Sequence, residues 1–410
     1  MLDINYIREN LDKVKKSVEA RKANVDLEKL LKLDLERREF IKKVDELRAK
    51  RNNAAKAKDI EIGKKIKGEL GELEKKLDEV EKQWNELMLQ VPNILLDEVP
   101  IGDATKNKVI RKERNPPKFP FKVKDHIELG KMLDIIDFDR GVKVGGFRGY
   151  YLKNEGAKLH WAILNFALDY ISLKGFQIVV PPIIDKGFVF VGGGHFPWNK
   201  DDTYKVGDDE YLAGTAEMPL MAMHADETFN LKDLPKKYVA LSPCFRTEIG
   251  SYGKDTKGLY RVHEFVKVEQ VILCEADEKE ALGYFEDLQD NAEGILQELD
   301  LPYQVVCLSS QEMGKKAALT YDIETWMPSR EGYGETHSNS IVFDFQTRRL
   351  KIKYRGEDGK VSFCHALNNT AIASPRILIP LLENFQTEDG SVKIPEVLQK
   401  YTGFSEIKPK

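Results

Sequence analysis

An apolar residue recurs every three or four positions between residues 66 and 91, and this repeat restricts the N-terminal fold more than any other feature of the chain. A second stretch, between residues 30 and 54, follows the same rule less cleanly. The two sets are Leu30, Leu33, Arg37, Phe40, Val44, Leu47, Arg51 and Ala54, and Ile66, Leu70, Leu73, Leu77, Val80, Trp84, Leu87 and Val91. Each set forms one apolar stripe on a helix, which is the seam of a coiled coil.

A short polar segment, RNNAAKAKDIEIG at residues 51–63, separates the two stretches. Two helices joined by a short connection fold back antiparallel. We therefore expect a coiled-coil arm over about residues 27–91, with about 25 residues in each helix, or roughly 40 Å at the helical rise of 1.5 Å per residue.

The far half of this arm is locally basic. Eight basic and two acidic residues lie between positions 48 and 67. A run of charge on a helix is often just its solvated surface, but a basic tip on a projecting arm also suits a phosphate backbone. The candidate nucleic-acid contacts are Arg48, Arg51, Lys56, Lys58, Lys64 and Lys65.

The composition limits the compartments in which the protein is expected to act and the partners it is expected to bind. The net charge of -4 gives no overall attraction to nucleic acid, so any basic surface must be local. The four cysteines are far apart, without C-x-x-C spacing, which favours a reducing cytoplasm. The N-terminus lacks a signal pattern and no long uncharged apolar run appears, so we expect a cytoplasmic protein without a membrane span.

Five prolines between residues 92 and 120 mark a domain boundary. We expect an N-terminal arm domain at 1–105, a linker at 106–125 and a second domain at 126–410. In the second domain helices and strands alternate, and no G-x-G-x-x-G follows a strand, so a mostly antiparallel sheet flanked by helices, an α+β fold, is favoured. The GGG at 192–194 lacks the G-K-[ST] ending of a phosphate loop, which favours a conformational role.

Residues 243–270, PCFRTEIGSYGKDTKGLYRVHEFVKVEQ, predict a strand, a turn and a second strand. This hairpin would carry a fixed cation, Arg246, two carboxylates, Glu248 and Glu269, and an aromatic ring, Phe265. Taken singly, such residues are more often exposed ion pairs or core aromatics. Together they are the groups that could bind a nucleoside triphosphate and a zwitterionic amino acid.

These motifs resemble the seryl-tRNA synthetases, a branch of the class II aminoacyl-tRNA synthetases, over nearly the whole chain. GFQIVVPP at 175–182 is similar to motif 1 and FRTE at 245–248 to motif 2. Arg376, which is expected to open the last helix in ASPRILIPLLEN, is similar to motif 3. The resemblance implies a homodimer that activates L-serine with ATP and Mg²⁺ and transfers it to the 3′ end of tRNA(Ser). The family also serves tRNA(Sec).

The resemblance implies an ATP site in which Arg246, Glu335 and Arg376 are catalytic. Arg246 would bridge the α-phosphate and the serine carboxylate, Arg376 would bind the γ-phosphate, and Glu335 would hold Mg²⁺. The implied ATP-binding residues are Arg246, Thr247, Glu248, Val262, Phe265, Glu335, Thr336, His337, Ser338 and Arg376. His337 replaces a hydroxyl residue of the usual pattern, and either a tolerated substitution or a metal ligand would explain it.

The resemblance also implies a serine pocket. Its residues would be Thr215, Ala216, Glu217, Arg246, Glu269 and Thr370. Taken singly, threonines such as Thr215 and Thr370 are more often turn residues. A pocket that hydrogen-bonds the substrate hydroxyl rejects alanine, because its own polar groups would otherwise stay unpaired. The Gly- and Lys-bearing loop at 250–258 is expected to contact the acceptor end of the tRNA.

Two other functions fit parts of the sequence. A synthetase homologue could pass an activated amino acid to a carrier protein, but the basic arm favours tRNA. A tRNA-binding relative could have lost activation, but Arg246, Glu248, Glu335 and Arg376 are all retained.

Overall fold

The computed structural model describes residues 1–249 and 257–410, and the chain divides into two compact units, Met1–Ile94 and Leu95–Lys410. The first unit is helical. Its helices are α1 (Ile4–Glu9), α2 (Leu11–Ala20), α3 (Leu27–Lys56) and α4 (Ile60–Gln90). The two short helices pack on the base of the long pair through a buried apolar cluster that includes Ile7, Val14, Leu30, Met88 and Val91.

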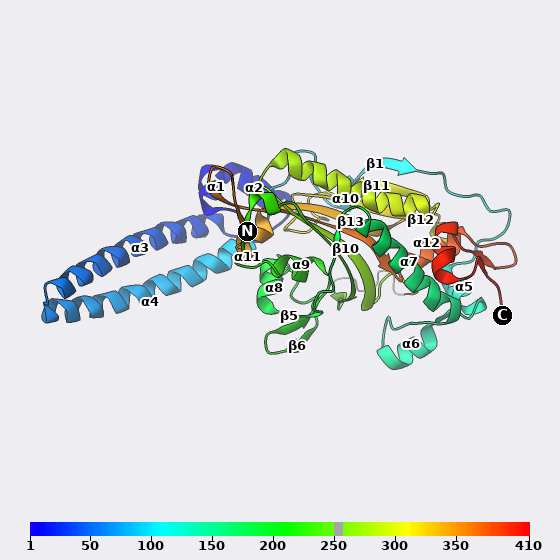
Figure 1. The fold of residues 1–410 in the computed structure, drawn as a ribbon, viewed down its shortest axis with the longest axis horizontal. Coiled ribbons are helices and arrows are strands. Elements are labelled where there is room, and N and C mark those ends of the chain that lie inside the picture. Colours follow the sequence, from blue (N-terminus) through cyan, green and yellow to red (C-terminus); the bar gives the residue numbers. More distant parts are fainter. Residues whose placement is uncertain (250–256) are drawn as a thin grey trace. The chain divides into compact units, whose positions relative to one another are not determined.

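The long helices α3 and α4 run antiparallel, as the heptad spacing predicts (Figure 1). Arg37 Nε lies 3.0 Å from Glu81 Oε1, and Arg48 Nη2 lies 2.9 Å from Glu74 Oε1. A later residue of α3 thus pairs with an earlier residue of α4, as in an antiparallel pair. The Arg37 guanidinium also lies 4.8 Å from the ring centre of Trp84. The predicted helical arm is therefore confirmed.

The connection between these helices is shorter than the sequence suggested. α3 continues through Lys56 and α4 begins at Ile60, so most of the polar segment 51–63 is helical. Asp59 caps α4 by accepting a hydrogen bond from the backbone N–H of Ile62 at 3.0 Å. Such a cap stabilises a helix start by about 1 kcal/mol, which lets α4 begin directly after the turn.

The second unit is built on an eight-stranded sheet with the order β1-β11-β12-β13-β16-β10-β9-β4 (Figure 1). Its neighbouring strands are antiparallel except β4 and β9, which are parallel. The strands are β1 (Lys108–Glu113), β4 (Gln177–Ile178), β9 (Lys236–Phe245), β10 (Glu264–Cys274), β11 (Tyr303–Cys307), β12 (Leu319–Met327), β13 (Gly332–Phe343) and β16 (His365–Ser374). The predicted mostly antiparallel sheet is confirmed, and β1 lies inside the stretch 106–125 that was expected to be a linker.

In the described part of this unit, shorter strands form four small sheets around the core. They are β2 (Ile136–Asp137), β3 (Tyr151–Leu152), β5 (Ile184–Lys186), β6 (Lys205–Gly207), β7 (Glu210–Leu212), β8 (Thr228–Asn230), β14 (Lys353–Arg355), β15 (Val361–Phe363), β17 (Val392–Lys393) and β18 (Glu406–Ile407). The helices of this unit are α5 (His126–Met132), α6 (Phe138–Gly145), α7 (Asn154–Ser172), α8 (Gly187–Gly192), α9 (Glu217–Ala222), α10 (Glu278–Glu298), α11 (Phe345–Leu350), α12 (Leu378–Asn384) and α13 (Glu396–Thr402).

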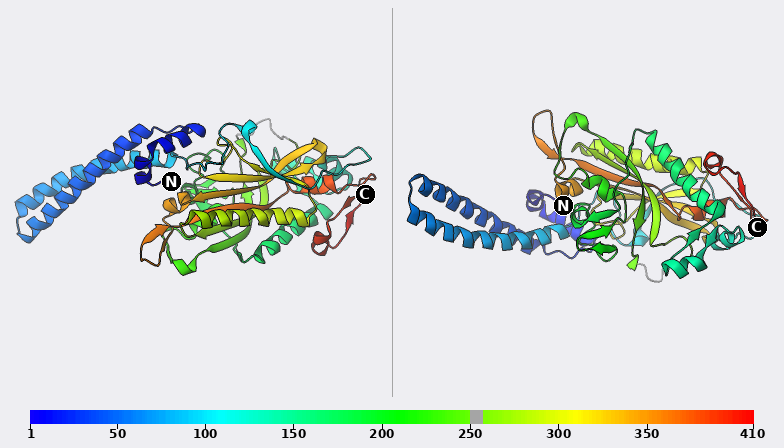
Figure 2. Two further views of the ribbon diagram at one scale, coloured as in Figure 1. Left: turned by 90° about the horizontal axis from the view of Figure 1, so that it is seen from above. Right: turned by 60° about the horizontal axis from the view of Figure 1, so that its bottom comes forward.

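Helices α7 and α10 pack against each other and cover one face of the large sheet (Figures 1 and 2). On that face, Asn291 of α10 donates a 2.9 Å hydrogen bond to Gln270, and Asn339 donates one of 2.9 Å to the carbonyl of Phe285. Side chains alternate between the faces of a strand, so the neighbours of Gln270 and Asn339 point to the other face. The candidate site lies there. No helix within residues 1–249 and 257–410 combines the length and apolarity that a membrane crossing requires.

Candidate active site

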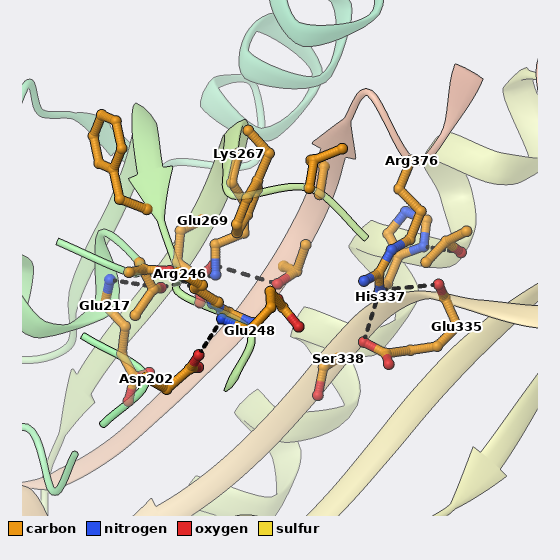
Figure 3. A pocket seen from close by; sticks show the side chains of 18 of the residues that line it. Asp202, Glu217, Arg246, Glu248, Lys267, Glu269, Glu335, His337, Ser338 and Arg376 are labelled. Atoms are coloured by element: carbon orange, nitrogen blue, oxygen red, sulfur yellow. Dashed lines mark hydrogen bonds and ion pairs between the residues drawn. The ribbon is translucent and has the colours of Figure 1, made fainter. Parts of the chain in front are cut away.

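A cavity of about 310 Å³ opens on the face of the large sheet opposite α7 and α10 (Figure 3). Volumes of this order are typical of small-molecule sites. Of the residues expected to bind ATP or serine, those lining the cavity are Thr215, Glu217, Arg246, Glu248, Val262, Phe265, Glu269, Glu335, Thr336, His337, Ser338, Thr370 and Arg376. The expected residues Ala216 and Thr247 do not line it. Thr247 instead donates a 2.9 Å hydrogen bond to the carbonyl of Asp201.

The predicted hairpin is formed by β9 and β10, which pair antiparallel with Phe265 opposite Cys244. Arg246 follows β9 directly, and its Nε donates a 3.2 Å hydrogen bond to the carbonyl of Gly214. Its guanidinium carbon lies 5.3 Å from the ring centre of Phe265. The backbone and the ring together fix a planar cation over the middle of the cavity.

Contacts with Asp202 and Arg261 hold Glu248 in place. Its backbone N–H donates a 2.6 Å hydrogen bond to Asp202, and its carboxylate forms a 2.7 Å ion pair with Arg261. Burial raises the pKa of Glu248, but the hydrogen bond from Arg261 and the charges of Arg246 and Arg376 outweigh this effect and lower the pKa. The carboxylate is therefore ionised and can accept hydrogen bonds.

Arg376 lies at the end of the cavity opposite Glu217, next to Glu335 (Figure 3). Its Nε donates a 2.9 Å hydrogen bond to the carbonyl of Tyr260, and its Nη1 lies 3.3 Å from Glu335 Oε1. Arg376 was expected to open the last helix, but α12 begins two residues later, at Leu378, and α13 follows it. Its position is set by Tyr260 and Glu335 rather than by a helix start.

A bulge in β13 places Glu335 and Ser338 on the same face of the sheet. Glu335 pairs with Glu324 and His337 with Ile323, so one extra residue of β13 lies between them. In a regular strand, residues three positions apart point to opposite faces. The bulge thus directs one carboxylate and one hydroxyl into the cavity.

This oxygen pair fits Mg²⁺. Mg²⁺ prefers oxygen ligands and is usually held by one or two carboxylates together with substrate phosphates and water. Among residues 1–249 and 257–410, no three His, Cys, Asp or Glu side chains converge as a metal site of their own. The cavity offers Glu335 and Ser338 as neighbouring donors to a metal arriving with a phosphate substrate.

His337 is buried beside them. Its Nδ1 lies 2.8 Å from the hydroxyl of Thr336. Burial lowers the pKa of His337 to about 3, so the imidazole is neutral at physiological pH. The residue packs within the sheet at the cavity wall.

Glu269 and Thr370 lie side by side in the lining of the cavity. They pair directly across β10 and β16, and the Thr370 hydroxyl lies 3.4 Å from Glu269 Oε2. Lys267, two residues before Glu269 and on the same face, forms an ion pair with it. Lys267 also donates a 2.8 Å hydrogen bond to the hydroxyl of Thr215. This end therefore combines hydroxyl, ammonium and carboxylate groups.

The GGG segment at 192–194 packs closely against this end. A Cβ atom on Gly193 would lie 2.6 Å from Met218 Cγ, and Gly194 has a φ of +75°, in the left-handed region. The Gly193 carbonyl accepts a 2.8 Å hydrogen bond from Gln346. These contacts agree with the conformational role expected for the glycines.

Two family models match the chain: the seryl-tRNA synthetase N-terminal domain over residues 1–95, and the tRNA synthetase class II core domain (G, H, P, S and T) over residues 202–385. A serine–tRNA ligase of Borreliella afzelii is 44% identical, with 99% of each chain covered. The crystal structure of seryl-tRNA synthetase from Pyrococcus horikoshii complexed with ATP superposes with a TM-score of 0.92 at 40% identity, over 100% of both chains.

The chain belongs to the seryl-tRNA synthetase family. The cytoplasmic serine–tRNA ligase from Naegleria fowleri in complex with AMP also superposes, with a TM-score of 0.90 at 33% identity over 100% of this chain and 99% of its own. The resemblance read from the three motifs is therefore confirmed.

Within this seryl-tRNA synthetase fold, several cavity residues were missed by the sequence analysis. They are Asp202, Tyr260, Lys267, Lys316 and Asn368. Lys267 could have been found, because it alternates with Phe265 and Glu269 along a predicted strand. Lys316 could not, because it lies in a loop before β12 that carries no periodic signal. The loop expected to contact tRNA, 250–258, falls largely outside the described residues.

Proposed function

We propose that this chain joins serine to tRNA in the cavity of the large sheet, with ATP at the end formed by Phe265 and Arg376 and serine at the end formed by Glu269 and Thr370. One observation carries the proposal. Arg246 stands between a cation–carboxylate pair suited to phosphates and a buried polar pocket suited to a small amino acid. Two solved relatives are in complex with ATP and with AMP, which supports nucleotide binding by this chain.

In this proposal, the adenine of ATP stacks on Phe265 beside the backbone of Val262, and Glu248 accepts a hydrogen bond from its amino group. Arg376 binds the γ-phosphate. When bound, Mg²⁺ would neutralise phosphate charge, and Glu335 and Ser338 would hold it. The fixed position of Arg376 against Tyr260 means that little rearrangement is needed at the moment of reaction.

In the first step, a carboxylate oxygen of serine attacks the α-phosphorus, and the bond from that phosphorus to the bridging oxygen breaks. Pyrophosphate leaves and seryl-adenylate remains. Negative charge spreads over the phosphate oxygens in the transition state, and Arg246 stabilises it while keeping the carboxylate in line. In the second step, a ribose hydroxyl at the 3′ end of the tRNA attacks the carbonyl carbon, and AMP leaves.

The serine pocket supplies a partner for each group of the substrate. Arg246 takes the carboxylate, Glu217 and Glu269 accept from the ammonium, and Thr370 with Glu269 accommodates the hydroxyl. The cost of leaving these buried groups unpaired would exclude alanine by a factor on the order of 10⁴.

The arm is proposed to bind the body of the tRNA(Ser). At its tip Arg51, Lys56, Lys58, Lys64 and Lys65 are exposed. Arg48 is paired with Glu74, which leaves it less suited to a phosphate than its neighbours. RNA helices are read mainly through backbone and shape, so exposed cations are the expected contacts. Residues 1–105 would act as the tRNA-binding domain and 126–410 as the catalytic domain, and tRNA(Sec) would use the same arm.

A homodimer is proposed from an exposed apolar surface beside edge strand β4. Leu173 is 87% exposed and Val180 88% exposed, with Ile178 between them at 49%. Ile178 and Val180 belong to the segment similar to motif 1, and Leu173 lies two residues before it. Monomeric proteins rarely leave a contiguous apolar patch in water, so a second copy is the expected cover. As a translation enzyme, the dimer would act in the cytoplasm.

Transfer of labelled serine distinguishes this function from loading of a carrier protein. The purified chain, ATP and serine are incubated with a tRNA(Ser) transcript or with a phosphopantetheine carrier protein. We expect acid-precipitable label on the tRNA and none on the carrier. Label on the carrier alone would overturn the proposal.

A further inference from the structure

Two buried ion pairs stand at the amino-acid end of the cavity. Lys267 pairs with Glu269, and Lys316 Nζ lies 2.5 Å from Glu217 Oε1. The four side chains are between 2% and 14% exposed. Each carboxylate that could accept from a substrate ammonium thus already has a lysine partner.

Three donors converge on one oxygen of Glu217. Besides Lys316, Gln346 Nε2 lies 2.6 Å and Asn368 Nδ2 3.1 Å from Oε1. The donors come from separate parts of the fold: the loop before β12, α11 and β16. This arrangement fixes the carboxylate and leaves its other oxygen, Oε2, as the one to meet a substrate.

Lys316 supplies the positive charge that opposes the burial of this carboxylate. Burial raises the pKa of Glu217, but the charge and hydrogen bond of Lys316 and the hydrogen bond of Gln346 outweigh burial and lower it. The other titratable groups that line this end of the cavity are His195, Arg246, Lys267 and Glu269. His195 cannot replace Lys316, because burial lowers its pKa to about 3 and leaves it neutral.

We propose that Lys316 is a positioning residue for serine: it keeps Glu217 ionised and holds Oε1, so that Oε2 accepts from the substrate ammonium. The proposal rests on the serine pocket proposed above. It predicts that Lys316 acts on amino-acid binding and not on ATP binding, because its partner Glu217 lies at the opposite end of the cavity from Glu335 and Arg376 (Figure 3).

The pH dependence of serine binding follows from the opposite effects of burial and of Lys316 on the pKa of Glu217. Without Lys316, burial is less opposed and the pKa of Glu217 rises. The carboxyl then takes up a proton as the pH falls, and a protonated carboxyl is a poor partner for an ammonium group. Loss of a charged hydrogen bond of this kind weakens binding by roughly 10- to 100-fold. Serine binding should therefore weaken most at low pH and recover at high pH.

The test compares Lys316→Met with Lys315→Met, a matched variant of the adjacent lysine, which does not line the cavity. Serine-dependent ATP–pyrophosphate exchange gives KM for serine and for ATP between about pH 6 and pH 9, above the ordinary pKa range of glutamate. For Lys316→Met we expect KM for serine to rise about 10- to 100-fold, mostly at low pH, with KM for ATP unchanged. Lys315→Met should change neither.

Two further variants test whether Glu217 is the group whose titration causes the pH dependence of KM for serine. Lys316→Arg should restore a flat pH profile, because it keeps the charge. Adding Glu217→Gln to Lys316→Met should remove the pH dependence, because the titrating group is gone. Thermal unfolding checks that each variant is folded, and if Lys316→Met is not, the Lys316→Arg and Lys316→Gln variants are compared instead.

An unchanged KM for serine in the folded charge-removing variant, or a pH dependence that survives Glu217→Gln, would overturn the role of Lys316. Either result leaves the proposed function standing as long as the wild-type chain shows serine-dependent exchange. Absence of that exchange in the wild type would instead refute the proposed function.

Discussion

At the scale of single residues, the proposed activation of serine depends most on the geometry of Arg246. Its guanidinium is held by the Gly214 carbonyl and the Phe265 ring, so its planar fork is already oriented before substrate binds. A lysine ammonium is a point charge that cannot make the same paired contacts with a phosphate and a carboxylate.

Replacing Arg246 with Lys should lower kcat for serine activation by about 100-fold or more, since donors aimed at transition-state charge carry effects of this size. Pyrophosphate exchange at saturating substrates measures the change. Arg355→Lys, on β14 and outside the cavity, is the matched control and should behave as wild type. A variant at Arg246 with near-normal kcat would show that this guanidinium does not act on the transition state.

Sequence reasoning found residues of the site that repeat along a strand or belong to a motif. Glu269 and Phe265 alternate in β10, and Arg246 follows β9, so all three reach the cavity as predicted. Lys316 and Asn368 reach Glu217 from a loop and a distant strand, and only the tertiary fold shows that contact. Thr247 was predicted to bind ATP because it lies within motif 2, but its hydroxyl donates a hydrogen bond to the carbonyl of Asp201 instead.

At the scale of elements, patterns with strong periodicity were predicted well. The heptad spacing predicted the helices α3 and α4, and the alternation of residues along the chain predicted the strands β9 and β10. Their ends were less predictable, because the cap at Asp59 decides where α4 begins. β1 was missed because its sequence, KVIRKE, lies exposed at the edge of the sheet and shows no buried face.

The tip of the arm yields a prediction about tRNA. Changing Lys56, Lys58, Lys64 and Lys65 to Glu should raise KM for tRNA and reduce its salt dependence, by about one unit of slope for each phosphate that the arm no longer neutralises. Serine activation should be unaffected, because none of these side chains lines the cavity. Aminoacylation at several salt concentrations provides the measurement.

The control for the tip reverses charge elsewhere in the same unit, at Lys13 and Lys16 of α2. This variant should keep wild-type tRNA kinetics. Equal losses in the two variants would point to general charge repulsion, and loss of activation in the tip variant would mean that the arm has a structural role.

At the scale of the whole molecule, the exposed apolar surface predicts the oligomeric state. The double variant Leu173→Asp and Val180→Asp places two charges on it, and these would be costly to bury against a second copy. Light scattering after size exclusion should report the mass of one chain for this variant and of two chains for the wild type. Val361→Asp, an exposed apolar position on β15, is the control and should remain dimeric. A wild-type monomer would contradict the proposed dimer.

The central claim is that one cavity activates serine and no other amino acid. ATP–pyrophosphate exchange measured separately with each of the twenty standard amino acids, in the absence of tRNA, tests it most directly. We expect rapid exchange with serine and exchange with alanine lower by a factor on the order of 10⁴. Exchange that is absent with serine, or equally fast with another amino acid, would contradict the claim.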